Sequence, residues 1–153
     1  METMRLAVLA LVACGSATTQ ESIDYVGGFA AQFPIPPTWH ARAHGVLVEA
    51  HAVEDKKPYE FAVRYDDVAA GLPRDRAIEE ARDAVLRGTK MPVASEVAAS
   101  LGDVPGTGIV FTRRSGTAIT RIFATATRVY EVSGAGPDKA LVVQFLDSFR
   151  LVQ

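Results

Sequence analysis

The chain has 153 residues, of which 48% are apolar and 22% charged, and its formal net charge is −2. This length accommodates one domain with a sizeable buried core. A nucleic-acid binder needs a surplus of basic residues to displace counterions from phosphates, whereas 16 Lys and Arg here face 18 Asp and Glu. We therefore expect no nucleic-acid partner. The single cysteine excludes an intrachain disulfide and any site that needs two thiolates.

The N-terminal segment has the pattern of an export signal. One basic residue precedes an unbroken apolar run, Leu6 to Ala13. This run is far shorter than the roughly 20 residues of a membrane-spanning helix and matches the apolar region of an export signal. Small residues flank Cys14, as cleavage by a signal peptidase requires. We predict a signal peptide over residues 1–13, in which the acidic Glu2 is unusual and makes Met4 an alternative start.

Leu11-Val12-Ala13-Cys14 resembles the lipobox of bacterial lipoproteins. In that family the cysteine thiol receives a diacylglyceryl group and cleavage leaves the cysteine as the first residue. The resemblance implies lipidation of Cys14 and a membrane anchor, in which each buried CH₂ contributes about 0.8 kcal/mol. By the family's sorting rule, Gly15 implies an outer membrane, with the domain facing the periplasm. The alternative is a buried N-terminal strand or helix with an incidental cysteine.

The segment after Cys14 is polar and has no period. We therefore expect residues 14–24 to be the lipidated cysteine with a flexible tether. Residues 25–153 are then a single domain. Gly27 to Pro37 predicts a short strand that prolines end.

Two alternating runs follow, Val46 to Val53 and Tyr59 to Tyr65, and polar residues with a proline, Asp55 to Pro58, separate them. In the second run Tyr59, Phe61, Val63 and Tyr65 share one face. Such alternation on both sides of a turn predicts a hairpin.

One long helix is predicted between Pro73, at its first position, and Gly88, just past its end. Its apolar stripe consists of Ala77, Ile78, Ala81, Ala84 and Val85. Its solvent face consists of Arg76, Glu79, Glu80, Arg82 and Asp83.

The strand period returns after this helix. The predicted order is a strand over Val93–Leu101, a turn over Gly102–Gly106, a strand from Ile109 to Arg113, a turn over Arg114–Gly116, and strands over Ile119–Ala126 and Val129–Ser133. Pro137 opens a last helix with a buried stripe of Leu141, Val142, Phe145 and Phe149. Short connections between consecutive strands predict an α+β domain, with an antiparallel sheet of about six to seven strands and helices packed on it.

Several local phrases accompany this order of elements: Gly28-Phe29 to Pro36 with Trp39 after it, Gly106, Arg121-Ile122-Phe123, Arg128 to Val132, and Phe145 to Leu151. Together they resemble the PsbP-like superfamily, which includes the Ran-binding Mog proteins and many bacterial lipoproteins. The resemblance covers Tyr25 to Gln153. It implies an α/β/α sandwich whose last helix runs directly into a Ser-Phe segment packed on the sheet. Members are mostly non-catalytic binding or assembly factors.

Three histidines, His40, His44 and His51, are candidate metal ligands. The first two lie four apart, but neighbouring prolines and a glycine disfavour the helix that would bring them together. No carboxylate with ligand spacing accompanies them. We therefore interpret them as surface or hydrogen-bonded loop histidines and predict no metal site.

Catalytic patterns are weaker still. No serine lies in a Gly-x-Ser-x-Gly elbow, and Ser148 is expected to cap or pack. Glu79 and Glu80 point about 100° apart on a helix, so they cannot act on one substrate together. We predict no catalytic and no cofactor-binding residues.

Two further features are possible binding elements. Gly134 to Pro137 precedes a helix and could hold an anion on free N–H groups, but it lacks the Lys-Ser/Thr of a phosphate loop, so we predict a turn and helix start. Trp39 with Phe33 could rim a ligand groove, although a lone tryptophan after a strand is expected in the core.

We therefore predict a non-enzymatic lipoprotein, anchored through Cys14 in the cell envelope. It would act as a binding or assembly factor whose partner is an envelope protein or a small apolar ligand. One alternative is a small envelope hydrolase with a site built from His40, His44 and distant carboxylates. Another is a lipid or small-ligand carrier.

Overall fold

The computed structural model describes residues 20–24, 26–42, 45–54 and 57–152. The predicted signal peptide, Cys14, His44 and the Asp55-Lys56 part of the predicted turn lie outside the described residues.

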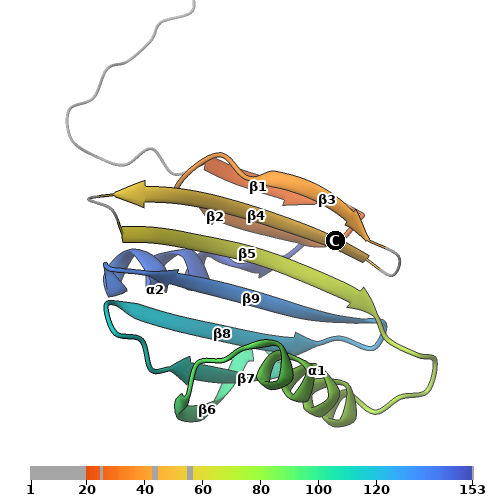
Figure 1. Cartoon of the computed structure of the whole chain (residues 1–153). Helices are drawn as coiled ribbons and strands as arrows, with labels where there is room; N and C mark the ends of the chain where they lie inside the picture. The colour runs from red at the N-terminus through yellow and green to blue at the C-terminus, as the bar shows by residue number, and fades with distance from the viewer. Residues whose placement is uncertain (1–19, 25, 43–44, 55–56, 153) are drawn as a thin grey trace, which may run out of the picture.

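Within the described residues, the chain forms a seven-stranded antiparallel sheet, a small three-stranded sheet and two helices (Figure 1). The main sheet has the order β3-β4-β5-β9-β8-β7-β6 and the small sheet the order β1-β2-β10. The elements are β1 (Gln20–Asp24), β2 (Phe29–Phe33), β3 (Thr38–Arg42), β4 (Gly45–Glu54), β5 (Lys57–Asp67), α1 (Arg74–Gly88), β6 (Val93–Leu101), β7 (Val104–Phe111), β8 (Thr117–Ala124), β9 (Arg128–Gly136), α2 (Lys139–Ser148) and β10 (Arg150–Leu151). The α+β class and the predicted strand number of the main sheet are confirmed.

Helix α1 covers one face of the main sheet over β7, β8 and β9. Its predicted apolar stripe is confirmed, since Ile78 and Val85 pack against buried Ile109 and Ile122. Arg82 on α1 also holds the edge strand β6, because its guanidinium donates two hydrogen bonds of 2.6 and 2.7 Å to the Glu96 carboxylate.

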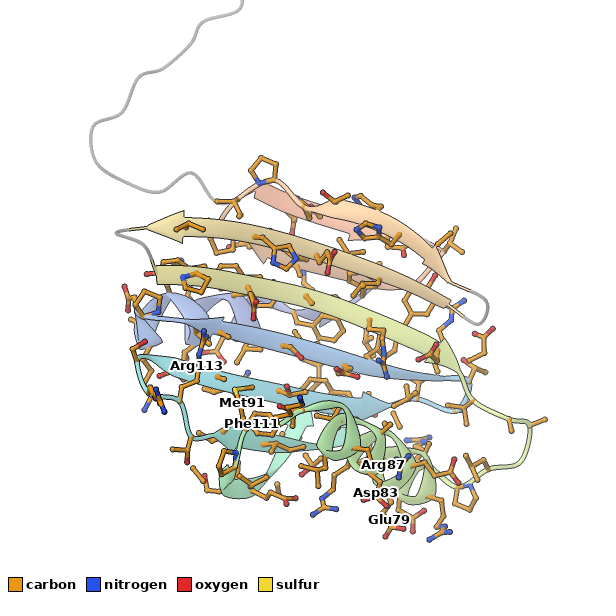
Figure 2. All side chains as sticks on the ribbon, in the orientation of Figure 1. Glu79, Asp83, Arg87, Met91, Phe111 and Arg113 are labelled. Atoms are coloured by element: carbon orange, nitrogen blue, oxygen red, sulfur yellow. The ribbon has the colours of Figure 1, made fainter. Side chains whose placement is uncertain are left out.

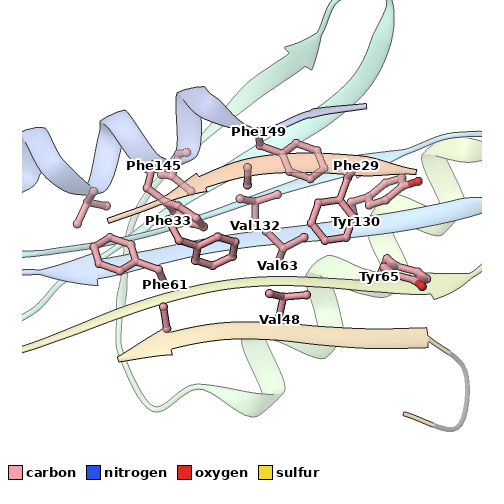
Figure 3. Close-up of a cluster of buried hydrophobic side chains, with 14 of the residues drawn as sticks. Phe29, Phe33, Val48, Phe61, Val63, Tyr65, Tyr130, Val132, Phe145 and Phe149 are labelled. Atoms are coloured by element: carbon pink, nitrogen blue, oxygen red, sulfur yellow. The ribbon is translucent and has the colours of Figure 1, made fainter. Parts of the chain in front are cut away.

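Helix α2 and the small sheet cover the opposite face. The larger core lies between the main sheet and the layer formed by α2 and the small sheet, and it is rich in aromatic rings (Figure 3). The Phe145 ring of α2 lies 4.9 Å from that of Phe33 and 5.1 Å from that of Phe61, centroid to centroid. Fully burying such a side chain contributes roughly 1.5–3 kcal/mol, so this layer dominates the stability of the fold.

The end of the chain connects α2 with the small sheet. Phe149 directly follows α2 and is buried, and β10 then pairs with β2. The Ser148 hydroxyl donates a 2.6 Å hydrogen bond to the Phe145 carbonyl and accepts one of 2.9 Å from the Gln32 amide. The expected Ser-Phe segment packed on the sheet is thus confirmed.

Gln20–Asp24 form strand β1, which corrects the flexible tether predicted for these residues. These residues pair with β2 along the whole of β1. The segment looks like a linker because its inward residues are polar: Ser22 and Asp24 are each 8% exposed, while Ile23 is 38% exposed. Asp24 is accommodated because its carboxylate accepts a 2.8 Å hydrogen bond from the Gly27 amide.

Two predicted turns are shorter than expected. Lys57 and Pro58 belong to β5, and Val104 to Gly106 belong to β7. Pro58 and Pro105 each lie outside one of the two pairings of their strand. Strand β9 pairs with β5 only from Glu60, and β8 pairs with β7 only from Gly106. Only one side of each strand is paired there, which is where a strand tolerates proline.

The helix boundaries also differ from the prediction. Pro73 is the N-cap of α1, and Gly88 is its last residue, followed by Thr89 as the C-cap. Helix α2 begins after Asp138 rather than at Pro137, because the Asp138 carboxylate accepts hydrogen bonds from the amides of the first turn. Among the described residues, neither helix has both the length and the apolar composition needed to cross a membrane.

Candidate functional site

Helix α1 leaves much of its face of the main sheet uncovered. The open part consists of β3, β4 and β5 (Figure 1). Alternation along these strands places Val48 and Phe61 in the core and turns Glu49, Glu60 and Arg64 to the open face.

Two hollows lie between α1 and this open face, with volumes of about 330 and 490 Å³. They share Arg64, Ala84 and Glu131 in their linings, so they are two parts of one groove. We call it the α1 groove and define it by its charged residues Glu49, His51, Glu60, Arg64, Asp66, Asp67, Glu80 and Glu131 with the small residues Ala62, Ala84, Ala118 and Ala135. It is open to solvent along its length.

Small side chains give the groove its depth. Ala62 on β5, Ala135 on β9 and Ala118 on β8 lie on the sheet side, and Ala84 lies on the α1 side. Met91 and Phe111 line the end near the C-terminus of α1 (Figure 2). The groove therefore has an apolar floor between charged margins.

Carboxylates dominate those margins. Six carboxylates and one guanidinium line the two hollows, which gives a formal charge of −5 with His51 neutral. The whole chain carries only −2. The negative charge of the molecule is therefore concentrated along this groove.

The one guanidinium is held between two of these carboxylates. Arg64 Nη2 lies 3.0 Å from Glu131 Oε2, its cross-strand partner on β9, and Arg64 Nε lies 3.5 Å from Asp66 Oδ2. Asp67 at one end lies 3.4 Å from Arg128. Ion pairs as exposed as these contribute about 0–1 kcal/mol each, so they orient side chains more than they stabilise the fold.

Uncharged hydrogen-bonding groups lie deeper, on the sheet. The hydroxyls of Thr120 and Ser133, a cross-strand pair of β8 and β9, are 3.0 Å apart. Thr120 is buried, whereas Ser133 is half-buried.

The structure brings two of the candidate histidines to one carboxylate. His40 Nε2 lies 3.1 Å from Glu49 Oε1, and His51 Nε2 lies 3.3 Å from Glu49 Oε2. His40 lies in strand β3 rather than in a loop, which corrects the expectation for that residue. The expected surface position is confirmed for both histidines, whose side chains are 46% and 58% exposed, and Glu49 contacts them although no ligand spacing in the sequence marks it. The contact between His40 and Glu49 crosses the β3–β4 ladder, which sequence spacing cannot reveal.

Both imidazoles reach the Glu49 carboxylate, but each contacts a different oxygen of it. The backbones lie far apart, because His40 is opposite Leu47, which is four residues from His51 along β4, or about 14 Å at 3.4 Å per residue. The Glu49 carboxylate lies between the two imidazoles. Within the described ranges, no three His, Cys, Asp or Glu side chains are placed to hold a metal ion.

The other candidate residues have structural partners. Ser148 packs and caps as predicted. Glu79 forms a 2.7 Å ion pair with Arg76 on the outer side of α1, whereas Glu80 lines the α1 groove. The two glutamates therefore face different surroundings, as their helical spacing predicts. The position of Glu80 on the α1 groove has no signal in the sequence.

The turn predicted for Gly134–Pro137 is wrong, because Gly134 and Gly136 lie within β9. A Cβ at Gly136 would overlap the Tyr59 ring, and one at Gly134 would lie 3.0 Å from Val142 of α2. These glycines therefore let the ring and the helix approach the strand.

Trp39 is not a core residue, contrary to expectation. It is 45% exposed on the edge strand β3, opposite Val48. Phe33 is fully buried against Phe145, so the two do not rim a common groove.

The resolved pKa shifts belong to residues outside the groove lining. Burial raises the pKa of Tyr130 and, together with the nearby Asp24 carboxylate, that of Tyr65. The hydrogen bonds between Arg82 and Glu96 lower the pKa of Glu96 and raise that of Arg82. Burial alone would lower the pKa of Arg128, but its interactions with Tyr130 and with Asp67 of the α1 groove raise it.

Comparison with known proteins supports the fold. No family model matches the sequence, and no curated protein matches it. The structure is similar to the solution structure of cyanobacterial PsbP (CyanoP) from Synechocystis sp. PCC 6803, with a TM-score of 0.59 and 12% sequence identity over 95% of this chain and 98% of that chain. A likeness at this identity concerns the fold and not the role. The chain therefore has the PsbP-like fold that its sequence phrases resemble.

Proposed function

We propose that this protein is a lipid-anchored, non-enzymatic binding or assembly factor of the cell envelope. The observation that carries the proposal is the α1 groove, a long open surface with an apolar floor and charged margins, of which some side chains are oriented by ion pairs. Such a surface is suited to recognising another molecule along its length. The PsbP-like fold agrees with an accessory role but does not specify it.

The groove favours recognition over catalysis for an electrostatic reason. Enzymes stabilise transition states with preorganised groups in sites from which water is excluded. Here the one guanidinium, Arg64, is already engaged by Glu131 and Asp66. Its charge is largely neutralised in a groove open to solvent, where it would stabilise a developing negative charge weakly.

The lipobox supports the anchor. A lipidated Cys14 would carry more than one acyl chain, and two chains hold a protein firmly where one gives marginal binding. The domain begins with β1 only six residues later, at Gln20, so the chain between them can span at most about 20 Å. The groove would then work close to a membrane surface, in our proposal that of an outer membrane facing the periplasm.

Lipidation is tested by expressing the full chain in a bacterium. We expect the chain to be cleaved before Cys14 and to gain the mass of a diacylglyceryl group, and to fractionate with the envelope membranes. Cys14→Ser, which removes the one thiol, should lose both the added mass and the membrane fraction, whereas Ser16→Ala should retain both. Wild-type protein without added lipid would refute the anchor.

The binding role is tested separately. Affinity purification of the full chain from detergent-solubilised envelope should return the same stoichiometric protein in repeated preparations. Recovery of the chain alone would contradict a binding or assembly role even if Cys14 is lipidated.

A further inference from the structure

We propose that the α1 groove binds a short, positively charged, extended segment of a protein partner. The segment would carry Lys or Arg side chains toward both ends and small apolar side chains between them. This inference rests on the proposed binding function and specifies the chemistry of the partner.

Charge complementarity is the first argument. The groove lining carries −5 of formal charge on a chain whose total is −2. Glu60 on β5 and Glu80 on α1 lie on opposite margins, both exposed and, within the described residues, without an ion pair. Their carboxylates are free to accept a cation from the partner. An anionic ligand would face repulsion from every margin, since Arg64 is already paired.

The shape of the groove is the second argument. On β5 the lining carboxylates run from Glu60 to Asp66, six residues apart on one face of the strand. At 3.4 Å per residue this is about 20 Å, the length of an extended segment of roughly six or seven residues. The Arg64–Glu131 pair lies between the two hollows, so each hollow can accept a cationic group at one end of the segment.

The floor of the groove gives the third argument. Ala62, Ala84, Ala118 and Ala135 leave space for small apolar side chains but little apolar area to bury. A small, highly charged polyamine would use the carboxylates and leave this floor in water. A peptide segment can use both, so the floor favours a peptide.

The test uses the full chain in an uncharged, non-ionic detergent. The probe is the fluorescent peptide Lys-Lys-Ala-Leu-Ala-Lys-Lys, and the same peptide with Glu in place of Lys is the negative probe. Binding is followed by fluorescence anisotropy. We expect saturable binding of the basic probe that weakens as salt is raised, and no binding of the acidic probe.

Groove variants separate a specific site from a general charge effect. Glu60→Gln with Glu80→Gln removes two carboxylates from the groove margins. Glu79→Gln with Asp103→Asn changes the net charge equally, but these residues lie outside the groove, Glu79 on the side of α1 away from β5 (Figure 2). We expect about tenfold weaker binding for the first pair and less than twofold for the second, with unchanged thermal midpoints for both.

Three results would overturn the inference. Equal weakening by both pairs of substitutions would mean that only net charge matters. No saturable binding of the basic probe would remove the site. Displacement of the probe by spermidine, added so that spermidine and probe supply equal concentrations of positive charge, would identify a polyamine site instead. None of these results affects lipidation of Cys14 or recovery of a stoichiometric envelope partner, so failure here is distinguishable from failure of the proposed function.

Discussion

The Tyr130 hydroxyl joins the main sheet to the small sheet. It is buried and donates a 2.7 Å hydrogen bond to the Gly27 carbonyl, 103 residues away. Gly27 itself has no space for a side chain, because a Cβ there would lie 2.5 Å from the Asp24 carboxylate and from the Tyr65 ring. The contact therefore depends on a close approach of two layers that only a glycine permits.

We expect Tyr130→Phe to destabilise the protein by about 1–3 kcal/mol at pH 7, because the buried Gly27 carbonyl loses its partner. Burial raises the folded-state pKa of Tyr130 above its unfolded value near 10. Its protonation thus contributes stability that is present below about pH 10 and is lost as the pH rises through the folded pKa. Tyr130→Phe should therefore lose less stability than wild type between pH 8 and 11, as measured by urea unfolding.

Tyr65→Phe is the matched control for this prediction. The pKa of Tyr65 is also raised by burial, but its hydroxyl does not bond to Gly27. Tyr65→Phe should also reduce the loss of stability at alkaline pH, and at pH 7 it should cost less stability than Tyr130→Phe does. If wild type and both variants lose stability equally above pH 10, the buried hydroxyls do not carry the pH dependence.

At the level of elements, Gly106 determines how closely β7 approaches β8. It is opposite Phe123, and a Cβ there would overlap the Ile122 carbonyl and the Phe123 ring. Backbone cannot move aside as a side-chain terminus can. A Cβ at Gly108, two residues along the same strand, would lie 3.3 Å from a Val97 methyl and 3.8 Å from the Val97 carbonyl oxygen, so it would overlap no backbone atom.

We therefore expect Gly106→Ala to cost about 1–3 kcal/mol or more in stability, and Gly108→Ala distinctly less. Chemical unfolding followed by circular dichroism measures both. Similar losses for the two variants would mean that strand propensity, rather than the approach of β7 to β8, sets the cost.

Regular alternation made the central elements predictable from sequence. In β5 the residues from Tyr59 to Tyr65 alternate between core and open face, and the apolar stripe of α1 has helical spacing. Strand β1 was missed because its inward Ser22 and Asp24 are polar. Trp39 was misplaced because its burial depends on β3 being the edge of the sheet, which only the strand order reveals.

The α1 groove could not be predicted for a related reason. Its central pair, Arg64 and Glu131, lies in directly opposed positions of strands that are separated in sequence by α1 and three further strands. Local patterns mark each of these residues only as an outward-facing strand position. Their meeting depends on strand order and register, which short-range periodicity does not contain.

At the level of the whole molecule, the main sheet carries two layers that are stabilised separately. One contains α1 and the cluster around Ile109, Phe111 and Ile122. The other contains α2 and the small sheet, and the Phe149 ring lies near its centre. Because β1 belongs to the second layer, the segment that leads to the proposed anchor is fixed to the domain through this layer and not through α1.

Phe149 is the residue on which this attachment depends most. Its ring lies 5.8 Å from that of Phe29 in β2, 5.9 Å from that of Phe123 in β8 and 5.7 Å from that of Tyr130 in β9, centroid to centroid. Phe149→Leu keeps an apolar side chain but loses these ring contacts. We expect a loss of roughly 1–3 kcal/mol, and local opening of the small sheet before the main sheet unfolds.

Hydrogen exchange followed by mass spectrometry distinguishes this local opening from general destabilisation. In Phe149→Leu the amides of β1 and β2 should exchange faster than in wild type, while those of β8 stay protected under the same conditions. Phe111→Leu makes the same chemical change in the α1 layer and should accelerate exchange in α1 but not in β1 or β2. Faster exchange of β1 and β2 in both variants would mean that the two layers open together. If only Phe149→Leu has this effect, weakening the α2 layer would free β1 from the domain, lengthening the segment between the proposed anchor and the fold while the α1 groove stays intact.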